Sequence, residues 1–504
     1  MSALLPALPL LLLLGGAACA LLARLGPQLA RWAALLSLLL AGLLLAALGL
    51  SFELGALQSS AAPGFAWRWE MAWIPRLGIS LQLGLDGLAL LLCGLTLLLG
   101  LLAVLASWGE IHERVGLYHL CLLWHLAGVL GVFLALDLFL FFVCWEAMLV
   151  PMALLIALWG HRGLGGRSPA YAAIKFFLFT QASGLLMLAA FAGLAWQHWL
   201  ATGSWSFDYF ALRELVPDPA WGRWLMLGLF VAFAVKLPAL GGHAWLPDAH
   251  SQAPTAGSII LAGVLLKTGA YGLLRFALPL FPQESAWLAP WAMALGVGGI
   301  LYGASLALAQ SDIKRFVAYT SISHMGFVLL GCYALQASAL QGVVALLLAH
   351  GLATGALFWL CGALYARLHS RDLARMGGLA PRLPRLASAW VFFGLASLGL
   401  PGLGNFVGEI LVLVGSFAVA PLAAVVAATG MVLAAVYGLR LISGVLHGPP
   451  RELGPADMAD LRGAEVGGLL LLGLLLLALG LYPQPVFELA DSAVTQALAA
   501  RGAP

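Results

Sequence analysis

About fourteen apolar runs of about 20 residues each recur along the chain, and they constrain its fold more than any other feature. A run of this length crosses the hydrocarbon core of a bilayer as one helix. The 504 residues are 63% hydrophobic and only 9% charged, which is too few polar groups to keep the surface in water. The sequence therefore predicts an all-α polytopic membrane protein. The predicted spans are residues 3–22, 30–51, 87–108, 115–134, 137–158, 170–195, 223–241, 256–277, 287–308, 315–335, 339–364, 387–416, 421–442 and 466–483.

The segments between the spans are short. The largest cover 52–86, 196–222 and 443–465, and none is long enough for a nucleotide-binding domain. The first span has no basic residue ahead of it and is followed by Arg24, so we expect a retained helix and not a cleaved signal peptide. We predict no soluble catalytic domain.

The basic residues indicate the orientation, because short cytoplasmic loops carry an excess of Lys and Arg. Alternate loops differ strongly in this respect. One side would hold Arg24, Arg31, Arg114, Arg162, Arg167, Lys175, Lys314, Arg315, Arg367, Arg371, Arg375, Arg382, Arg385, Arg440, Arg451 and Arg462. The other side would hold only Arg68, Arg76, Arg213, Arg223, Arg275 and Arg501. Both termini are therefore predicted to face away from the cytoplasm, and the net charge of +3 suggests no nucleic-acid partner.

Cofactor motifs do not emerge from the sequence. The six cysteines stand alone within apolar spans, without metal or iron–sulfur spacing, and are interpreted as small buried hydrophobes. The glycine-rich stretches lack the ending of a phosphate loop. His243, Asp248 and His250 in "HAWLPDAHSQAPT" could suggest a metal, but the prolines and interfacial position fit a proton entrance or a structured loop better. We predict no redox centre, nucleotide or metal on this chain.

The informative residues are ionisable ones at membrane depth, where each costs at least about 2.5–3.5 kcal/mol on insertion scales. They occur in different spans at similar depth, so side-by-side helices would align them in the membrane plane. These candidate proton-transfer residues are Glu146, Lys236, Lys267, His324, His350 and Glu409.

Lysine usage favours proton transfer over charge pairing. The chain has twenty arginines and four lysines, and two of those lysines, Lys236 and Lys267, lie inside spans. Arginine stays protonated in proteins, whereas a desolvated lysine can lose about three pKa units and exchange a proton near neutral pH. We therefore interpret Lys236 as a switchable proton carrier whose proton is held when Glu146 pairs with it. The structural alternative is a fixed ion pair of these two residues that holds helices together.

Two spans are predicted to be discontinuous. Pro238 with Gly241 and Gly242 interrupts the seventh span, and Pro401 with neighbouring glycines interrupts the twelfth. The breaks share the patterns "LPALG" and "LPGLG" and would enter the membrane from opposite sides. This arrangement favours inverted repeats of about five helices, with exchange sites and internal water near the breaks.

Other polar residues receive structural interpretations. His119 and His125 are expected to be packed, hydrogen-bonded histidines. Asp137 is expected to be an N-cap. Asp312, Lys314 and Arg315 are expected to be interfacial anchors.

Four motifs carry a resemblance to a known family. "WLPDAHSQAPTAGSIILAGVLLKTGAYGLLR", "FFVCWEAMLVPM", "AYTSISHMGFVLLG" and "LPGLGNFVGEILVLVG" strongly resemble signatures of the antiporter-like subunits of respiratory complex I, over roughly residues 115–440. Glu409, where the L- and N-type relatives typically carry lysine, and the lack of a long C-terminal lateral helix look most like the M-type branch of bacterial NADH:quinone oxidoreductase.

The resemblance implies a fold and a division of the chain. It implies fourteen helices with two inverted five-helix repeats and discontinuous helices 7 and 12. Residues 1–112 would form three N-terminal helices, 113–277 the first repeat (helices 4–8) and 286–442 the second (helices 9–13). Residues 443–504 would hold a cytoplasmic loop, helix 14 and a C-terminal tail.

The resemblance also implies a function. The chain would be a proton-translocating subunit in a bacterial inner membrane, driven by quinone chemistry in partner subunits that carry NADH, FMN, iron–sulfur clusters and quinone. Its partners would be L- and N-like antiporter subunits, small membrane subunits and the lipid bilayer. Glu146, Lys236, Lys267 and Glu409 carry over as the main proton-transfer residues, with His324 and His350 as intermediates.

Two other functions share these sequence features. A multisubunit Na⁺/H⁺ antiporter would use the same fold and lysines, and sodium dependence of transport would favour it. A non-transporting structural membrane subunit would use buried ion pairs only to specify its fold, and the intramembrane lysines argue against it.

Overall fold

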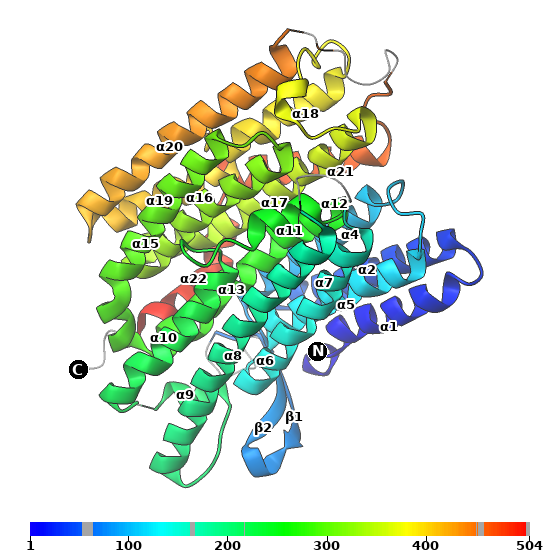
Figure 1. The fold of residues 1–504 in the computed structure, drawn as a ribbon. Helices are drawn as coiled ribbons and strands as arrows, with labels where there is room; N and C mark the ends of the chain where they lie inside the picture. The colour runs from blue at the N-terminus through cyan, green and yellow to red at the C-terminus, as the bar shows by residue number, and fades with distance from the viewer. Residues whose placement is uncertain (53–63, 162–166, 216, 450, 452–457, 500–504) are drawn as a thin grey trace.

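A computed structural model describes the chain except residues 53–63, 162–166, 216, 450, 452–457 and 500–504. In the described part, twelve helical segments are long and apolar enough to cross a membrane. They lie side by side in one elongated bundle (Figure 1). Their main helices are α1 (Ala7–Leu22), α2 (Pro27–Leu50), α4 (Gly87–Ala106), α5 (Val115–Leu134), α6 (Leu138–Ala147) with α7 (Leu149–Trp159), α8 (Pro169–Thr202), α12 (Thr255–Ile260) to α14 (Leu278–Leu280), α15 (Pro282–Leu308), α16 (Ile313–Ala334), α17 (Ala337–Leu368), α20 (Pro421–Ile442) and α21 (Ala464–Leu481).

The remaining two predicted spans are discontinuous, as expected. Helix α10 (Pro219–Lys236) ends two residues before Pro238, and the chain becomes helical again at α11 (Leu246–Gln252). Helix α18 (Pro384–Ser397) and α19 (Gly404–Phe417) flank Pro401 in the same way. A proline cannot donate the helical hydrogen bond and the following glycines adopt positive φ, at 92° for Gly241 and 93° for Gly402. The all-α polytopic fold class is confirmed.

The eighth span contains two π turns that the sequence did not predict. Between α12 and α14 the chain passes through η3 (Leu261–Leu265), α13 (Leu266–Gly272) and η4 (Leu273–Ala277), and every residue of the span is buried. π turns often occur at functional sites because they redirect backbone carbonyls.

Regular structure also occurs where only loops or a tail were expected. Strands β1 (Trp67–Ile74) and β2 (Ile79–Leu85) form an antiparallel hairpin through η2 (Pro75–Leu77) and Gly78, whose φ is 63°. The last described helix is α22 (Gln484–Ala499), which packs against α4 and α17. Short elements η1 (Ser2–Leu4), α9 (Tyr209–Arg213), η5 (Leu373–Arg375) and η6 (Ser443–His447) complete the described chain.

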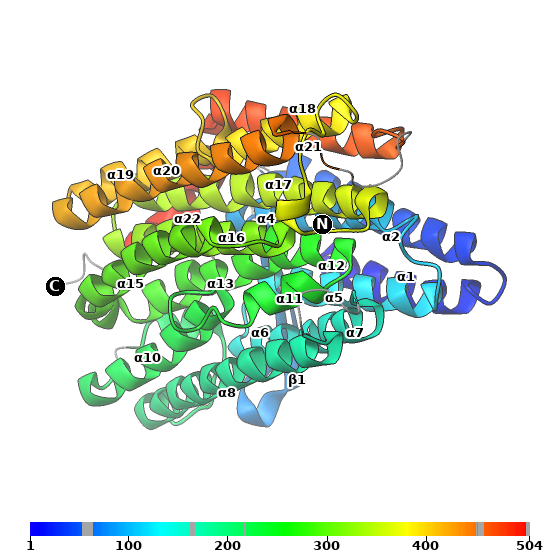
Figure 2. The same cartoon turned by 45° about the horizontal axis from the view of Figure 1, so that its top comes forward.

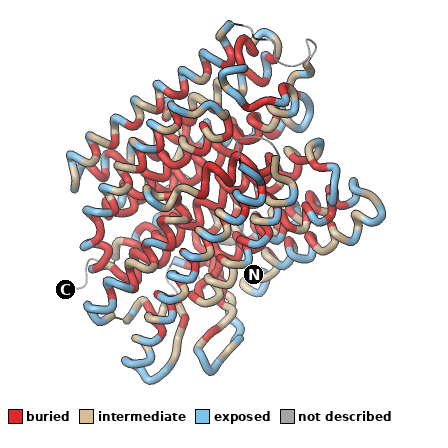
Figure 3. The backbone as a smooth tube through the Cα atoms, in the orientation of Figure 1, coloured by how far each residue is buried: buried red, intermediate tan, exposed pale blue. Residues whose placement is uncertain are grey.

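Burial separates the bundle into a central and a peripheral group of helices. The eighth span and α17 are the most deeply buried, and α16 is nearly so (Figure 3). Peripheral α1, α2, α20 and α21 instead expose large apolar side chains such as Leu43 and Leu422. Such a surface is stable against lipid and not against water, so the bundle is built to sit in a bilayer.

Close packing of the central helices depends on glycine. A Cβ at Gly326 of α16 would lie 2.6 Å from the carbonyl oxygen of Gly296 on α15, and one at Gly408 of α19 would lie 2.7 Å from the backbone of Leu346 on α17. Small residues let membrane helices approach until their backbones touch. They bring α19 against α17, which positions the second half of the site described below.

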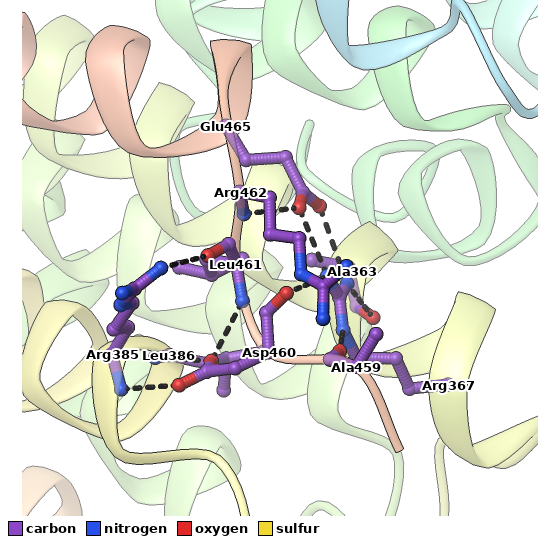
Figure 4. A network of polar contacts seen from close by, with 9 residues as sticks. All are labelled: Ala363, Arg367, Arg385, Leu386, Ala459, Asp460, Leu461, Arg462 and Glu465. Atoms are coloured by element: carbon purple, nitrogen blue, oxygen red, sulfur yellow. Dashed lines mark hydrogen bonds and ion pairs between the residues drawn. The ribbon is translucent and has the colours of Figure 1, made fainter. Parts of the chain in front are cut away.

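A polar network ties α17, α18 and α21 together at one end of the bundle (Figure 4). The Asp460 carboxylate accepts hydrogen bonds from the backbone N–H groups of Arg385 and Leu386, at 2.7 and 3.0 Å, and so caps α18. Arg367 on α17 pairs with Glu465 on α21 at 2.9 Å. These contacts fix the start of the broken helix α18 relative to its neighbours.

Candidate functional site

The six predicted proton-transfer residues lie on six different helices of the bundle. Lys236, Lys267 and His350 are fully buried, His324 and Glu409 are nearly so, and Glu146 is partly exposed. The helices that carry them lie beside one another in both views of the ribbon (Figures 1 and 2). They are Glu146 on α6, Lys236 at the end of α10, Lys267 on α13, His324 on α16, His350 on α17 and Glu409 on α19.

At one end of the row, Glu409 contacts His324. The Glu409 Oε1 and His324 Nδ1 atoms are 3.0 Å apart, and His324 Nε2 is 3.3 Å from the hydroxyl of Ser397. Ser397 is the last residue of α18, at the edge of the helix break. A Cβ at Gly399, inside the break, would lie 2.6 Å from Glu409 Oε2. The break therefore makes the room that the carboxylate occupies.

Lys267 and His350 form the centre of the row. The Lys267 Nζ atom is 2.7 Å from His350 Nδ1 and donates a hydrogen bond of 2.5 Å to the carbonyl oxygen of Ala262. Ala262 belongs to the π turn η3, so the irregular backbone supplies this acceptor. The rings of His350 and His324 are 5.4 Å apart. A continuous series of titratable groups thus runs from Lys267 to Glu409.

Lys236 is held differently from Lys267. Its Nζ atom lies 4.9 Å from the centre of the Trp145 ring and has no hydrogen-bond partner among the described residues. A cation over an aromatic face is stabilised by the ring quadrupole, but far less than by a hydrogen-bonded carboxylate. The ammonium is therefore buried with weak compensation.

Glu146 interacts electrostatically with Lys236 but does not contact it. No ion pair joins them in the described chain, and Glu146 Oε1 is itself without a hydrogen-bond partner there. A Cβ at Gly184 on α8 would lie 2.1 Å from this oxygen, so a larger residue at position 184 would clash with the carboxylate. The fixed ion pair that was the structural alternative is absent between these two described residues.

His250 belongs to the buried surroundings of Lys267 and His350, a position that the sequence analysis did not predict. Its ring stacks on Phe358 with a centroid distance of 4.3 Å, and the residue is fully buried on α11. It interacts electrostatically with Lys267 and His350. The short helix after the first break carries it inward from the entrance where it was expected.

The other histidines agree with their structural interpretation. His119 Nδ1 lies 2.8 Å from the Val115 carbonyl, and His125 Nδ1 lies 2.7 Å from the Met148 carbonyl. His125 also interacts electrostatically with Lys236, so it borders the row. Both are packed and hydrogen-bonded.

Asp248 is the centre of a charged cluster at the Arg-rich end of the bundle. It pairs with Arg167, Lys175 and Arg315 at 3.1, 2.7 and 2.8 Å. Three cations on one carboxylate need no metal ion, and the described residues contain no group of three potential metal ligands. This cluster ties α8 and α16 to α11.

Two basic residues are buried and bonded in ways that the sequence did not predict. Lys314, expected as an interfacial anchor, is buried, and its Nζ donates a 2.9 Å hydrogen bond to the Ala253 carbonyl. Arg275 was counted with the basic residues of the outer side, although it falls within the predicted span 256–277; it lies in the π turn η4, where it is buried and paired with Asp86. The observed span continues to Leu280, three residues past the predicted end. Asp137 and Asp312 do cap helices, as Asp137 was expected to do.

Glu110 is a further residue that the sequence analysis missed. Its two carboxylate oxygens accept hydrogen bonds from the Thr255 backbone N–H, at 3.1 and 3.2 Å, and so cap the first turn of the span that carries Lys267. Burial would raise the pKa of Glu110, but the hydrogen bond from His161 and the charge of Lys314 outweigh it and hold that pKa below its usual value. Burial and Lys314 lower the pKa of His161, so a neutral ring faces an ionised carboxylate. An isolated acidic residue in a loop gave no sequence signal for this role.

Comparison with known proteins fits this arrangement. The family model described as "NADH:quinone oxidoreductase/Mrp antiporter, TM" matches residues 135–434, which include all six members of the row. NADH-quinone oxidoreductase subunit M of Pseudomonas aeruginosa is 54% identical over 97% of this chain and 96% of its own. The subunit M of Escherichia coli K12 is 50% identical over 97% of each chain.

The chain belongs to the NADH:quinone oxidoreductase/Mrp antiporter family.

Solved structures agree with this family assignment. A chain of respiratory complex I from Thermus thermophilus with bound NADH superposes with a TM-score of 0.82, at 33% identity and over 99% of both chains. A chain of the Mrp complex from Dietzia sp. DQ12-45-1b has a TM-score of 0.83 at 22% identity over 98% of both chains, a likeness of fold alone. The family resemblance and its M-type branch are confirmed.

Proposed function

We propose that the chain is the M-type proton-translocating subunit of a bacterial NADH:quinone oxidoreductase. Partner subunits would bind NADH, FMN, iron–sulfur clusters and quinone, while this chain moves protons between its helices. Its neighbours would be L- and N-like antiporter subunits and small membrane subunits in the inner membrane. Subunit M relatives at 54% and 50% identity support this assignment over a Na⁺/H⁺ antiporter subunit.

One observation carries the mechanism. Lys236 and Lys267 are fully buried at membrane depth, and neither ammonium contacts a carboxylate in the described chain. A purely structural lysine at this depth would be expected to pair with one, because an unpaired charge costs several kcal/mol. We infer that each lysine alternates between charged and neutral forms.

The row supplies a path for the proton. Loss of a proton from Lys267 to His350 would be followed by transfer toward His324 and Glu409 over the contacts described above. Glu146 would set how firmly Lys236 holds its own proton, through their electrostatic interaction. The six residues Glu146, Lys236, Lys267, His324, His350 and Glu409 thus act as one proton-transfer axis.

The two broken helices also suggest how the chain divides into repeats. Residues 113–277 and 286–442 would be two inverted repeats that each contain one broken helix, preceded by three helices in 1–112 and followed by helix 14 and the tail in 443–504. The charge bias would place the Arg-rich loops in the cytoplasm and both termini on the other side.

Replacing Lys236 by arginine tests the proton-carrier role. Lys236→Arg keeps the charge but cannot release a proton. Because a positioned proton-transfer group contributes at least about 100-fold to a rate, NADH:quinone turnover and acidification should fall more than about tenfold in membrane vesicles. Lys175→Arg is the matched control, since its pair with Asp248 needs only charge. Wild-type values for Lys236→Arg in the assembled complex would refute the role.

A further inference from the structure

Two aromatic rings from neighbouring helices face the Lys236 ammonium. Its Nζ atom lies 4.9 Å from the centre of the Trp145 ring on α6 and 5.9 Å from that of the Phe176 ring on α8. All three residues are fully buried. The face of an aromatic ring carries partial negative charge and attracts a cation more strongly where water is excluded. The two rings therefore stabilise the charged form of the lysine in the position where the structure places it.

Packing, and not a hydrogen bond, fixes the orientation of the Trp145 ring. Phe141 lies one turn earlier on α6 with its ring centre 5.6 Å away, and the Phe233 ring on α10 lies 5.7 Å away in a T-shaped arrangement. A buried tryptophan usually donates its N–H to a partner, but Trp145 Nε1 has none among the described residues. The indole therefore interacts with the lysine through its face and makes no other polar contact in the described chain.

The broken helix fixes the position from which Lys236 reaches these rings. Helix α10 ends at Lys236, and the carbonyl oxygen of Val235 accepts a 3.0 Å hydrogen bond from Trp245 Nε1. Trp245 also packs against Phe176, with 5.4 Å between the ring centres. One side chain thus holds both the end of the helix and the second ring. The part of the site that is left to move is the lysine side chain itself, a flexible four-carbon stem.

Helix α6 presents two different partners to that side chain. Trp145 and Glu146 are consecutive, so their side chains leave the helix about 100° apart. The ammonium lies at the ring, whereas Glu146 acts on it electrostatically and forms no ion pair with it in the described chain. A lysine that carries a proton away from Glu146 must stay charged while it is unpaired. The ring face is the group that meets this need.

We propose that Trp145 is a positioning residue that holds the Lys236 ammonium while Glu146 does not pair with it. The lysine alternates between the carboxylate and the ring and keeps its proton during this movement, so no covalent bond changes. The ring shortens the time for which the charge has no partner at all. This inference rests on the proposed function and adds one residue to the machinery around Lys236.

Fluorinated tryptophans at position 145 test the role of the ring face. Fluorine withdraws charge from the face and changes the shape of the side chain little. Site-specific incorporation of mono-, di- and trifluorotryptophan should lower NADH:quinone turnover of the assembled complex step by step, up to about tenfold over the series. A purely steric role would leave turnover unchanged along the series.

Trp390 is the matched control position. It is buried on α18, its Nε1 also has no partner among the described residues, and no cation lies over its ring in that part of the chain. The same fluorinated series at Trp390 should leave turnover at the wild-type value.

Substitution gives a second test with a rescue. Trp145→Leu removes the ring and should lower NADH:quinone turnover and acidification together by about tenfold. Trp145→Phe should recover most of this loss, because a benzene ring also attracts a cation. Phe176→Leu should have a smaller effect than Trp145→Leu, since the Phe176 ring lies farther from the ammonium. Trp390→Leu controls for the loss of a buried indole.

The outcomes separate this inference from the function on which it rests. Turnover that does not change along the fluorinated series at position 145 would overturn the role of the ring. Equal losses in assembled Trp145→Leu and Trp390→Leu complexes, or in Trp145→Leu and Trp145→Phe, would overturn it as well. If Lys236→Arg still lowers turnover in those cases, the proposed function stands and only the role of Trp145 fails. If Lys236→Arg has no effect, the proposed function fails on its own.

Discussion

At the scale of single residues, the main contrast lies between charges with a contact partner and charges without one. Arg275 and Asp86 are both buried and paired, and Arg275 also contacts the Tyr271 hydroxyl at 3.2 Å. By contrast, Lys236 Nζ and Glu146 Oε1 have no hydrogen-bond partner among the described residues, and no ion pair joins the two residues there. A paired charge keeps its protonation state, whereas an unpaired one can change it. We therefore assign Arg275 to stability and Lys236 to transport.

This assignment predicts the effect of removing Arg275. Arg275→Met leaves the Asp86 carboxylate buried and uncompensated, which typically costs about 3–5 kcal/mol. The assembled complex should unfold at a lower temperature in detergent, and less of it should accumulate in the membrane. Arg275→Met combined with Asp86→Asn should recover part of the loss, because the stranded charge is gone. A single variant as stable as wild type would contradict the assignment.

The sequence predicted residue roles unevenly. Lys236, Lys267 and Glu409 were recognisable because a charge inside an apolar run is rare. His250 was misplaced, because nothing in its local sequence shows that the helix after a break turns inward. The buried pair of Arg275 with Asp86 was missed, because it joins two distant segments and involves a π turn. Such turns are decided by packing against other helices and leave no periodic signal.

At the scale of elements, Glu110 caps the N-terminus of the eighth span from the loop before α5, which is distant in the sequence. A carboxylate at a helix N-terminus is favoured by the exposed N–H groups and the helix dipole. Since η3 then presents the Ala262 carbonyl to Lys267, the placement of this helix start contributes to the geometry of the lysine. The proline breaks were visible in the sequence, whereas this contact between distant segments was not.

The capping role predicts a pH-dependent effect of Glu110→Gln. The pKa of Glu110 lies below its ordinary value of 4.5, so the ionised carboxylate stabilises the fold above pH 4.5. That contribution is lost as pH falls through the lowered pKa. Thermal unfolding should therefore show Glu110→Gln about 0.3–1 kcal/mol less stable than wild type at pH 7, with a smaller difference near pH 4. Glu113→Gln, which changes an exposed loop carboxylate, is the matched control.

The β hairpin shows a second limit at this scale. The runs "WRWEMAWI" and "ISLQLGL" on either side of "PRLG" contain strand formers and a turn, which could have indicated it. Because strongly apolar spans flank this segment on both sides, we predicted only a connecting loop there. Helix α22 was missed for a similar reason, because its alternating polar and apolar residues are too short a pattern to count as a span.

At the scale of the whole molecule, the bundle combines a lipid-facing exterior with a buried charged row. The number of spans and the two breaks could be predicted because hydrophobic length and proline act locally. That the six charged groups lie at similar depth in the membrane, inferred from their positions within spans, stays a prediction. The contacts between them could not be predicted, since those depend on which helices pack together.

The charge bias predicts the orientation of the bundle. A cysteine at Ser204, in the exposed segment after α8, should react with a membrane-impermeant maleimide in intact cells. A cysteine at His112, in the exposed segment before α5, should react only after the membrane is opened. Five of the six native cysteines are buried, so maleimide labelling of the unmodified chain should be low. The reverse pattern of labelling would invert the proposed topology.

The central claim is that protons move through the axis as part of turnover. Its most direct test compares NADH-driven acidification with NADH:quinone turnover in native membrane vesicles that carry Glu146→Gln. Because Gln cannot carry the charge that influences Lys236, we expect both quantities to fall together in a fully assembled complex. Loss of acidification alone would make the axis a separable channel. Wild-type values for both would show that the charged row is structural and would contradict the account.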